Sequence, residues 1–488
     1  MRSTFIQVAS VLSLLLFASG AGAATLQVGP GKPYAAPCAA IAAAAAGDTI
    51  EIDAAGSYSG DVCYWATDNL TIKGVNGRPK IDANGQASQG KGIWVIGGDN
   101  TTIENVELTG ATVPDQNGAG IRQEGKNLTV RGTYFHDNED GILAGDNDGS
   151  EILIEGCEFG FNGFGDGYSH NLYINHVAKL IFRYNYSHDC KVGHLVKSRA
   201  AENHILYNRL TQESGSGSYE IDLSNGGLSY IIGNLVQQGP SSENSNLVSY
   251  AGEGGNPKNP SFELFVVNNT FVNQKGNGTF VNIGGAVDVA AVIRNNLFVG
   301  SDNITGQATA ILEGNFSAKD GDPMLVNLDA FDYHLQAGSP CKDAGVDPGT
   351  GAGMSLAPTK HYVHPASSEG RTSVGAIDIG AYEIGGGTGG SGGAGGSGGA
   401  GGGQGGQGGS GGAGNGGSGG SGASGAAGGA GGGAGGEGGS GGGGGDGSGD
   451  DGGCGCRAAG ESPVGAGGGA AAGLLLGLSL LLRRRRGA

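Results

Sequence analysis

The stretch Ile205-Leu-Tyr-Asn-Arg-Leu210 contains the pattern that decides the fold. Two or three apolar residues are followed by a polar or glycine position, often by asparagine, and then by an aromatic or aliphatic residue. The pattern occurs at seven further places, which are Thr102–Leu108, Thr129–Phe135, Leu153–Phe159, Ile181–Tyr186, Ile231–Val236, Val266–Phe271 and Ile293–Phe298.

The spacing of these copies predicts a solenoid. The anchoring apolar residues are Ile103, Val130, Ile154, Phe182, Ile205, Ile231, Val266 and Ile293, and the steps between them are 27, 24, 28, 23, 26, 35 and 27 residues. A period in the twenties, with β-branched strands and Gly, Asn and Asp at the corners, is typical of a coil of short strands. The Leu-x-x-Leu-x-Leu pattern of leucine-rich repeats is absent from these stretches.

Asparagines recur at one phase of the repeat, which indicates a stacked amide ladder at a corner. The five residues in register are Asn185, Asn208, Asn234, Asn269 and Asn296. Asparagines in phase can each satisfy the neighbour one rung away, whereas isolated ones would indicate only turns.

A second set of predicted strands falls between the first. Its members are Gly92–Ile96, Gly120–Glu124, Gly141–Leu143, Asn171–Ile174, His194–Lys197, Glu220–Leu223 and Thr279–Ile283. With two interleaved sets of strands, the chain resembles the right-handed parallel β-helix proteins of the pectate lyase-like superfamily, over about residues 40–320. We therefore expect an all-β coil over residues 24–320.

The two ends of the coil are expected to be closed. Residues 38–46 are rich in alanine and predict a helical turn that covers the first rung. The stretches Asp322–Asn327, Asp332–Pro340 and Asp378–Glu383 resemble the ending of many secreted bacterial β-helices, which implies a C-terminal cap over residues 321–384.

The N-terminus predicts export. Arg2, an apolar run over residues 5–17 and the small residues 21–23 form the pattern of a secretory signal over residues 1–23, cut after Ala23. Export permits disulfides, and Cys38 with Cys63 is the pair that we expect to clamp the N-terminal end.

The C-terminus predicts surface attachment. Residues 385–453 contain 45 glycines in 69 positions and read as a flexible, disordered Gly/Ser-rich linker. Residues 454–488 hold Cys454, Cys456, an apolar stretch and four arginines, and this order resembles the MYXO-CTERM sorting tail of myxobacterial surface proteins. The resemblance implies processing at Cys454 or Cys456, while a retained single-span anchor is the alternative.

Composition excludes some partners. The 27 Lys and Arg residues against 45 Asp and Glu give a net charge of −18, which repels nucleic acid. Between the two ends no run of 18 apolar residues occurs, which excludes a membrane-embedded body. We expect a monomer.

One basic stretch interrupts this acidic chain. Residues 179–209 hold six Lys and Arg residues against Asp189 and Glu202, and five of the nine histidines lie in or beside them. Alignment of the second strands on Leu172, Leu195 and Ile221 predicts two columns of neighbouring residues: Asn171, His194 and Glu220, and then Tyr173, Val196 and Asp222.

This cluster suits β-elimination on an acidic polysaccharide. The reaction needs a positive group or Ca²⁺ on the substrate carboxylate, a base and an acid. Lys197, His194 and Tyr173 are the candidates for base and acid, and Arg199 is the candidate for the carboxylate grip. The predicted substrate-binding residues are His170, Asn171, Glu220, Asp222 and Asn225.

A second resemblance concerns the lysine. Residues 194–199, followed by Asn203, are similar to the lysine-bearing strand of the alginate lyase and chondroitinase B family, which implies that Lys197 is the base. The sequence departs from that family at residues 219–224, which lack its arginine, and at residues 191–193, which lack its carboxylates for Ca²⁺. Strict alternation from Leu195 would also point Lys197 inward, unless the strand ends at Val196.

Other interpretations stay open. The same histidines, tyrosine and lysine could form only a solvated face of a non-catalytic adhesin or structural surface β-helix. The acidic corners 137–140 and 146–148 could take Ca²⁺, although such corners are more often turns. The Asn-Thr-Asp and Gly-His-Gly triplets of polygalacturonase-type hydrolases are absent from the coil. Cys454 and Cys456 stand too close together for a zinc site.

These observations predict an exported protein, attached to the cell surface or outer envelope through its tail or secreted after processing. Its expected partner is an acidic polysaccharide. No metal ligand is assigned, and Ca²⁺ stays open as a cofactor.

Overall fold

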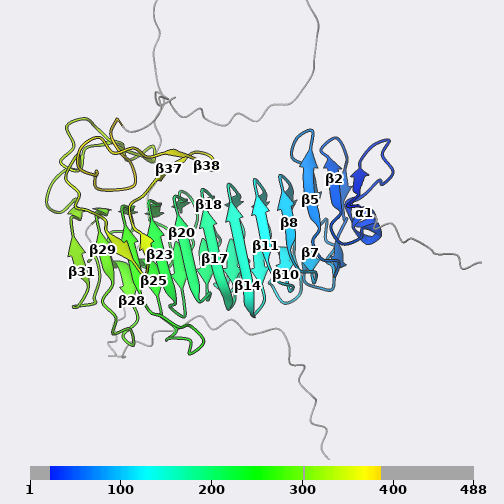
Figure 1. Cartoon of the computed structure of the whole chain (residues 1–488), viewed down its shortest axis with the longest axis horizontal. Coiled ribbons are helices and arrows are strands. Elements are labelled where there is room, and N and C mark those ends of the chain that lie inside the picture. The colour runs from blue at the N-terminus through cyan, green and yellow to red at the C-terminus, as the bar shows by residue number, and fades with distance from the viewer. Residues whose placement is uncertain (1–21, 301–302, 386–488) are drawn as a thin grey trace, which may run out of the picture. The chain divides into compact units, whose positions relative to one another are not determined.

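The computed structural model describes residues 22–300 and 303–385, and they form a parallel β-solenoid built from three sheets (Figure 1). Sheet A contains β1 (Thr25–Val28), β2 (Thr49–Asp53), β5 (Thr71–Val75), β8 (Thr101–Glu104), β11 (Leu128–Arg131), β14 (Asn147–Glu155), β17 (Val177–Arg183), β20 (Glu202–Leu206), β23 (Leu228–Ile232), β26 (Leu264–Val267), β29 (Val292–Arg294) and β31 (Ile311–Glu313). Sheet B contains β3 (Tyr58–Ser59), β6 (Lys80–Asp82), β9 (Glu107–Thr109), β12 (Tyr134–His136), β15 (Glu158–Gly160), β18 (Tyr186–His188), β21 (Arg209–Thr211), β24 (Leu235–Gln238), β27 (Thr270–Asn273), β30 (Leu297–Val299) and β32 (Phe316–Ser317). Sheet C contains β4 (Cys63–Trp65), β7 (Gly92–Ile96), β10 (Ala119–Gln123), β13 (Asp140–Ala144), β16 (Leu172–Ile174), β19 (Val196–Ser198), β22 (Ile221–Leu223), β25 (Asn246–Tyr250) and β28 (Thr279–Ile283). The predicted all-β coil is confirmed.

Each repeat of the sequence motif forms two strands, not one. In the copy at residues 205–210, β20 ends at Leu206 and β21 begins at Arg209. Between them Tyr207 has a φ of 56°, a left-handed conformation that turns the chain sharply from sheet A into sheet B. Glycine serves at the same corner one rung later, where Gly233 has a φ of 69° and a Cβ would lie 2.5 Å from the Tyr207 ring. A turn of the coil therefore holds three strands rather than the two sets that the sequence indicates.

The predicted asparagine ladder is confirmed at this corner. The side-chain Nδ2 of each asparagine donates to Oδ1 of the next, over 3.1 Å from Asn185 to Asn208 and 3.0 Å from Asn208 to Asn234. The ladder continues through Asn269 and Asn296 at 2.9 Å per step, and ends on Asn315 at 3.0 Å. Each Oδ1 also accepts the backbone N–H of the preceding asparagine, so the corner leaves few buried amides unpaired.

The core lies inside the coil, where alternate residues of all three sheets meet. Phe135 and Phe159 stack at 4.9 Å between ring centroids, and Phe271 and Phe298 stack at 5.4 Å. Most inward residues of sheets A and C are Ile, Val and Leu with no exposed surface. Burial of these side chains at the same phase of each rung fixes the register, because a slip of one residue would turn them outward.

The N-terminal end is closed as predicted by a helical turn and a disulfide. Helix α1 (Pro37–Ala43) begins with proline in its first turn, and buries Ala40 and Ile41 against the first rung. Cys38 at its start is bonded to Cys63 in β4, over a Cα–Cα distance of 5.7 Å. Among the described cysteines, Cys157, Cys190 and Cys341 are unpaired and buried.

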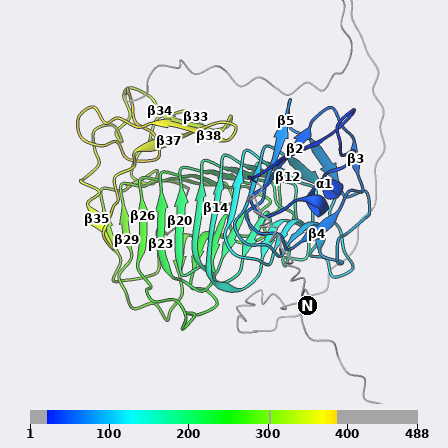
Figure 2. The same ribbon diagram turned by 45° about the vertical axis from the view of Figure 1, so that its right-hand side comes forward.

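The C-terminal segment contains three hairpins (Figure 2), which are β33 (Leu325–Asn327) with β34 (Asp332–Leu335), β35 (Thr350–Gly351) with β36 (Met354–Ser355), and β37 (Lys360–Val363) with β38 (Ser367–Gly370). The segment contacts the outside of sheets A and B: Asn268 Nδ2 donates to the carbonyl of Asp378 over 2.9 Å. Tyr333, Tyr362 and Tyr382 pack on residues of sheet B. These contacts lie along the flank of the coil, and the expected capping of its end stays a prediction.

The predicted signal peptide, glycine-rich linker and sorting tail lie almost wholly outside the described residues. In the part of the chain that is described, no helix has the length and hydropathy needed to cross a membrane.

Candidate functional site

The predicted site residues meet on the outer face of sheet C, but in a different register from the one expected. Tyr173 of β16 pairs with Lys197 of β19, and Lys197 pairs with Asp222 of β22. Val196, which we had placed in this column, pairs with Ile221 and points inward with no exposed surface. The expected alignment was therefore wrong by one residue at β19.

The physical reason is the corner before β19. The backbone N–H of Asn171 donates to the carbonyl oxygen of His194, and the N–H of Leu195 donates to the carbonyl oxygen of Tyr219. Leu195 therefore lies between Asn171 and Glu220. Leu195 and Val196 are both buried, which breaks the strict alternation from which an inward Lys197 was derived. Lys197 consequently lies on the outer face of the sheet.

Lys197 is the centre of a compact charged cluster. Its Nζ lies 3.2 Å from Oδ2 of Asp222 and 3.2 Å from Oε1 of Glu253. Arg199 lies 2.5 Å from the other oxygen of Glu253 and donates a hydrogen bond to the hydroxyl of Tyr173. Both cations also lie over the Tyr173 ring, at 5.9 Å for Lys197 Nζ and 5.4 Å for the Arg199 guanidinium carbon.

The cluster is almost wholly buried, although it lies outside the coil. Lys197 is 1% exposed, Asp222 4% and Tyr173 6%, whereas the side chain of Glu253 is 24% exposed. Burial by itself would raise the pKa of Asp222, but the Lys197 ammonium and the hydroxyl of Ser224 bring it below its ordinary value. Asp222 is thus an ionised carboxylate paired with an ammonium.

Two histidines form a stacked ladder beside this cluster. The rings of His170 and His194 lie 4.6 Å apart at 13°, and the N–H of His194 donates to His170 Nδ1 over 3.0 Å. His194 Nδ1 in turn accepts the N–H of Tyr219 over 3.2 Å, and its Nε2 lies 3.6 Å from Asp222. Burial, reinforced by Lys197 and Arg199, lowers the pKa of His194 to about 3, so the ring is neutral at physiological pH.

This geometry gives His170 and His194 a positioning role. Each Nδ1 holds a backbone N–H of the next rung, and His194 is only 1% exposed. In this structure the Nε2 side of His194 faces Asp222, and the role of His194 as a proton-transfer group stays a prediction.

Two of the predicted substrate-binding residues lie inside the coil. Asn171 Nδ2 donates to Ser187 Oγ over 3.0 Å and to the carbonyl of His188 over 2.9 Å. Glu220 has no exposed surface, and burial raises the pKa of its carboxyl well above the ordinary value. Neither side chain reaches the outer face, so direct substrate contact is wrong for both, because the corner turns this phase of the rung inward.

Asn225 lies at the edge of the cluster. Its Nδ2 donates to the carbonyl of Gly254 over 3.4 Å, and its own carbonyl accepts Asn259 Nδ2 over 3.1 Å. Both partners belong to residues 252–263, which connect β25 to β26 and which we call the strap.

The strap supplies a residue of the cluster that the sequence analysis did not include, Glu253. A signal for it was present, since the step from Ile231 to Val266 is 35 residues while the others are 23 to 28. The excess is an inserted segment, although its path over sheet C could not be read from its length.

The acidic corner at the start of β14, formed by Asp146 and Asp148, also meets the strap. Oxygen atoms of Asp146 and Asp148 and a ring nitrogen of His176 lie within 4.8 Å of one another. Lys258 of the strap places its ammonium 2.8 Å from Asp148 and 3.5 Å from Asp146. One intramolecular cation is thus paired with both carboxylates of this corner.

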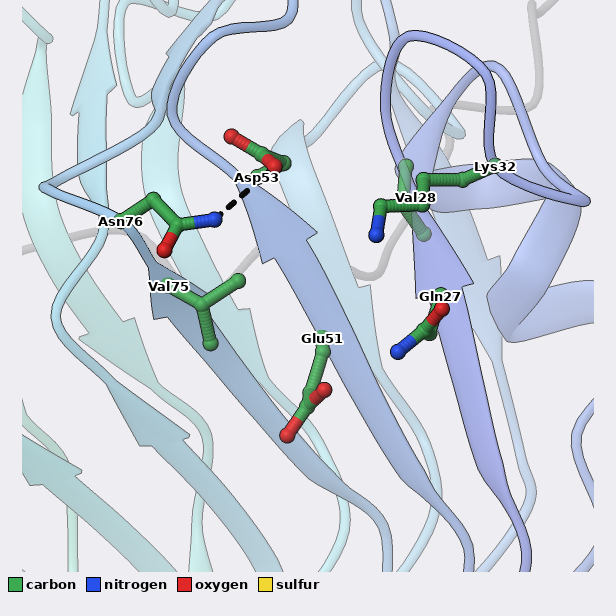
Figure 3. Close-up of a pocket in the computed structure, with 7 residues that line it drawn as sticks. All are labelled: Gln27, Val28, Lys32, Glu51, Asp53, Val75 and Asn76. Carbon is green, nitrogen blue, oxygen red and sulfur yellow. Dashed lines mark hydrogen bonds between the residues drawn. The ribbon is translucent and has the colours of Figure 1, made fainter.

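A separate hollow lies on the outer face of sheet A at the first rungs (Figure 3), lined by Gln27, Val28, Lys32, Glu51, Asp53, Val75 and Asn76. Its polar groups pair with each other or with neighbours: Asn76 Nδ2 donates to Asp53 over 3.0 Å, and Glu51 pairs with Lys73 at 3.1 Å. It contains none of the stacked acid–base groups that distinguish the cluster on sheet C.

Fold and site define a parallel β-solenoid that carries a charge-compensated polar cluster on the outer face of one sheet. Comparison with known proteins agrees with the fold. A family model described as a right-handed β-helix region matches residues 60–236. The crystal structure of pectate lyase Pel9A is similar, with a TM-score of 0.52 and 16% identity over 74% of this chain and 96% of that chain.

A second solved structure, described as Geobacillus virus E2 ORF18, is 13% identical over 57% of this chain and 56% of that one, with a TM-score of 0.37. No curated protein matches the sequence. At 16% identity the pectate lyase structure shows the fold alone, and the chemistry of the site is argued from this chain's own residues.

Proposed function

We propose that this chain is an exported, surface-attached β-helix protein that acts on an acidic polysaccharide by β-elimination at the cluster on sheet C. The observation that carries the proposal is the arrangement of Lys197, Arg199 and Tyr173. Lys197 and Arg199 share the carboxylate of Glu253, and the phenol of Tyr173 on the neighbouring rung accepts a hydrogen bond from Arg199. The similar fold of pectate lyase Pel9A is a further support.

In β-elimination a base removes the proton from the carbon next to the uronate carboxylate. The electrons form a carbon–carbon double bond, the bond to the leaving oxygen breaks, and that oxygen takes up a proton. Arg199 is suited to hold the substrate carboxylate, because a guanidinium binds it with two parallel hydrogen bonds. Its contact with Tyr173 puts a phenol and the amine of Lys197 next to the carboxylate that Arg199 would hold.

The other residues of the site prepare these groups. Asp222 holds Lys197 in place, and neutral His194 orients Asp222 without adding charge. Stacked histidines that also hold the backbone keep the column of side chains in register from rung to rung.

The residues present do not favour Ca²⁺ at this place. The ion takes six to eight oxygen ligands, whereas the carboxylates of Asp222 and Glu253 are already paired with Lys197 and Arg199. We therefore derive no step through a metal ion.

Export and attachment are part of the same proposal. Cleavage after Ala23 would create a new N-terminus at Ala24, whose nitrogen lies 2.7 Å from Oδ1 of Asp48. A free α-ammonium placed there would gain an ion pair. Attachment rests on the resemblance of residues 454–488 to a sorting tail.

The test is absorbance from unsaturated uronides when the purified chain is incubated with a panel of polyuronates and glycosaminoglycans. We expect product with the unaltered chain and with Lys126→Ala, an exposed lysine outside the cluster, and none with Lys197→Ala. No product from any substrate, with or without added Ca²⁺, would contradict the lyase proposal.

A specific observation favours the second candidate, a non-catalytic surface β-helix that only binds glycan or protein. Lys197 is 1% exposed and both of its carboxylate partners are in place, which is the arrangement expected of a purely structural network. Retention of the chain on a glycan array without product formation would support this candidate.

A further inference from the structure

The strap is the longest insertion in the repeat, and it runs backwards along the coil. It leaves sheet C after β25, and its side chains contact residues of four earlier rungs. Those residues are Asn225 after β22, Lys197 and Arg199 on and after β19, His176 after β16, and Asp146 and Asp148 after β13. One inserted segment therefore spans the whole candidate site.

Glu253 at the start of the strap binds the two cations of the site. One of its carboxylate oxygens lies 3.2 Å from Lys197 Nζ, and the other lies 2.5 Å from an Arg199 nitrogen. A carboxylate shared between two cations is the geometry that these residues would offer to a uronate. Glu253 thus occupies the position that the proposed function assigns to the substrate carboxylate.

The far end of the strap is fastened by polar contacts. Lys258 pairs with Asp148 over 2.8 Å, where both side chains are about half exposed or more, and Asn259 Oδ1 lies 3.0 Å from His176 Nε2. Ion pairs in contact with solvent are weak and are screened by salt. The strap adds little to the core, because only Phe262 among its twelve residues is a large apolar side chain, and Phe262 is partly exposed.

Segments with few buried apolar contacts open at low free-energy cost. The two ends of the strap are also chemically different, since Glu253 presents an anion to a basic pair and Lys258 presents a cation to an acidic pair. A polyanion that enters the site competes directly with Glu253 for Lys197 and Arg199. It does not compete with Lys258, whose contact with Asp148 breaks when the strap moves.

We propose that the strap is an autoinhibitory segment, in which the Glu253 carboxylate blocks the grip formed by Lys197 and Arg199 until a carboxylate-bearing sugar displaces it. This inference rests on the proposed function for the identity of the ligand, and it adds a means of regulation and a ligand class to the same site. The displaced strap would uncover Lys197, which is the most deeply buried cation of the cluster.

The first experiment needs no ligand. Hydrogen–deuterium exchange of residues 252–260 is compared between the unaltered chain, Glu253→Gln and the control Glu243→Gln, which makes the same charge change on an exposed residue. The backbone N–H of Glu253 donates to the carbonyl oxygen of Ser224, and the N–H of Asn256 donates to the carbonyl oxygen of Asn225. Release of the strap therefore exposes both N–H groups to solvent. We expect faster exchange in Glu253→Gln only, and equal exchange in all three chains would overturn the inference.

The second experiment adds polygalacturonate as the probe. We expect Glu253→Gln to bind about tenfold more tightly, because affinity rises in proportion to the open fraction of the strap. Addition of the probe to the unaltered chain should accelerate exchange in residues 252–260. Binding of equal strength in both chains, with no change in exchange, would overturn the strap inference and leave the proposed function standing.

One further outcome would contradict the proposed function itself. If Glu253→Gln frees the strap but neither chain binds polygalacturonate or any other polyuronate, the proposed function fails, and with it the inhibitory role of the strap.

Discussion

The ammonium of Lys197 lies 3.2 Å from the carboxylate of Asp222, on the neighbouring rung, with both side chains buried on the outside of the coil. An ion pair of this kind is typical of an interior, and here it is covered by the strap and by the histidine ladder. The pair therefore links the stability of the protein to the position of the strap and to the proposed site.

Replacement of Lys197 by methionine should destabilise the protein strongly. The change leaves the buried carboxylate of Asp222 without its ammonium, and loss of one partner of a buried pair costs about 3 to 5 kcal/mol. We expect the free energy of unfolding, measured in urea, to fall by about 3 kcal/mol, and to recover in part in Lys197→Met with Asp222→Leu. A loss below about 0.5 kcal/mol would mean that the pair is not buried in solution.

Stability should fall in mild acid because of His194. Its folded-state pKa of about 3 lies below the ordinary value of 6.5, so the unfolded chain binds a proton first as pH falls. The contribution is complete above pH 6.5 and is lost on acidification towards pH 3, by about 2 kcal/mol between pH 7 and pH 5. The melting temperature should follow this slope, and His194→Gln should flatten it.

The exposed His334, whose side chain is 55% exposed, provides the control. His334→Gln should leave the pH dependence unchanged. An equal slope in both variants and in the unaltered chain would contradict the assignment of a buried, neutral His194.

The asparagine ladder should be most sensitive at its middle. Asn208→Ala removes the acceptor of Asn185 and the donor to Asn234, all within the buried corner. Each buried group left unpaired costs about 1 to 3 kcal/mol, so we expect a loss of about 3 kcal/mol in urea unfolding. Asn315→Ala, at the partly exposed end of the ladder, should cost less than half of that. Equal losses at both positions would argue against a cooperative ladder.

Processing after Ala23 should be visible in the stability of the exported chain. The Ala24 nitrogen lies 2.7 Å from Asp48, and backbone N–H groups of Ala24 and Ala45 lower the pKa of that carboxyl. The stabilisation is present above the ordinary pKa of Asp48 and is lost as pH falls through the lowered one. N-terminal sequencing should begin at Ala24, and Asp48→Asn should lower the melting temperature at pH 7 but not at pH 2. A mature N-terminus elsewhere would remove the basis of this prediction.

Much of the fold could be predicted because its signals repeat. One motif of a few residues, such as residues 205–210, returns at similar spacing, so the coil, the asparagine ladder and the interleaved strands followed from the chain alone. The third sheet was missed, because a corner made by single left-handed residues such as Tyr207 leaves no break in the apolar pattern.

The site was harder to predict than the fold. Residue types and their neighbourhood were found, since Tyr173, Lys197, Arg199 and Asp222 do meet. Their column was misaligned by one residue at Leu195. Asn171 and Glu220 were assigned to the outer face of the sheet, whereas their side chains lie inside the coil. Glu253 was not considered, because its partners lie two rungs back along the coil.

The sequence by itself determined the solenoid, because burial of one residue type per rung repeats along the chain and needs only local register. It also indicated the stretch in which charged groups gather, whereas the pairing of Cys38 with Cys63 was one expectation among several possible pairings and was decided by the structure. Only the tertiary structure decided which side chains share the outer face of sheet C, and that Glu253 forms ion pairs with Lys197 and Arg199 there. A corner can shift the inward and outward alternation of the next strand by one residue. The path of an inserted segment depends on ion pairs with residues that are distant in the sequence. Neither effect leaves a local pattern in the sequence.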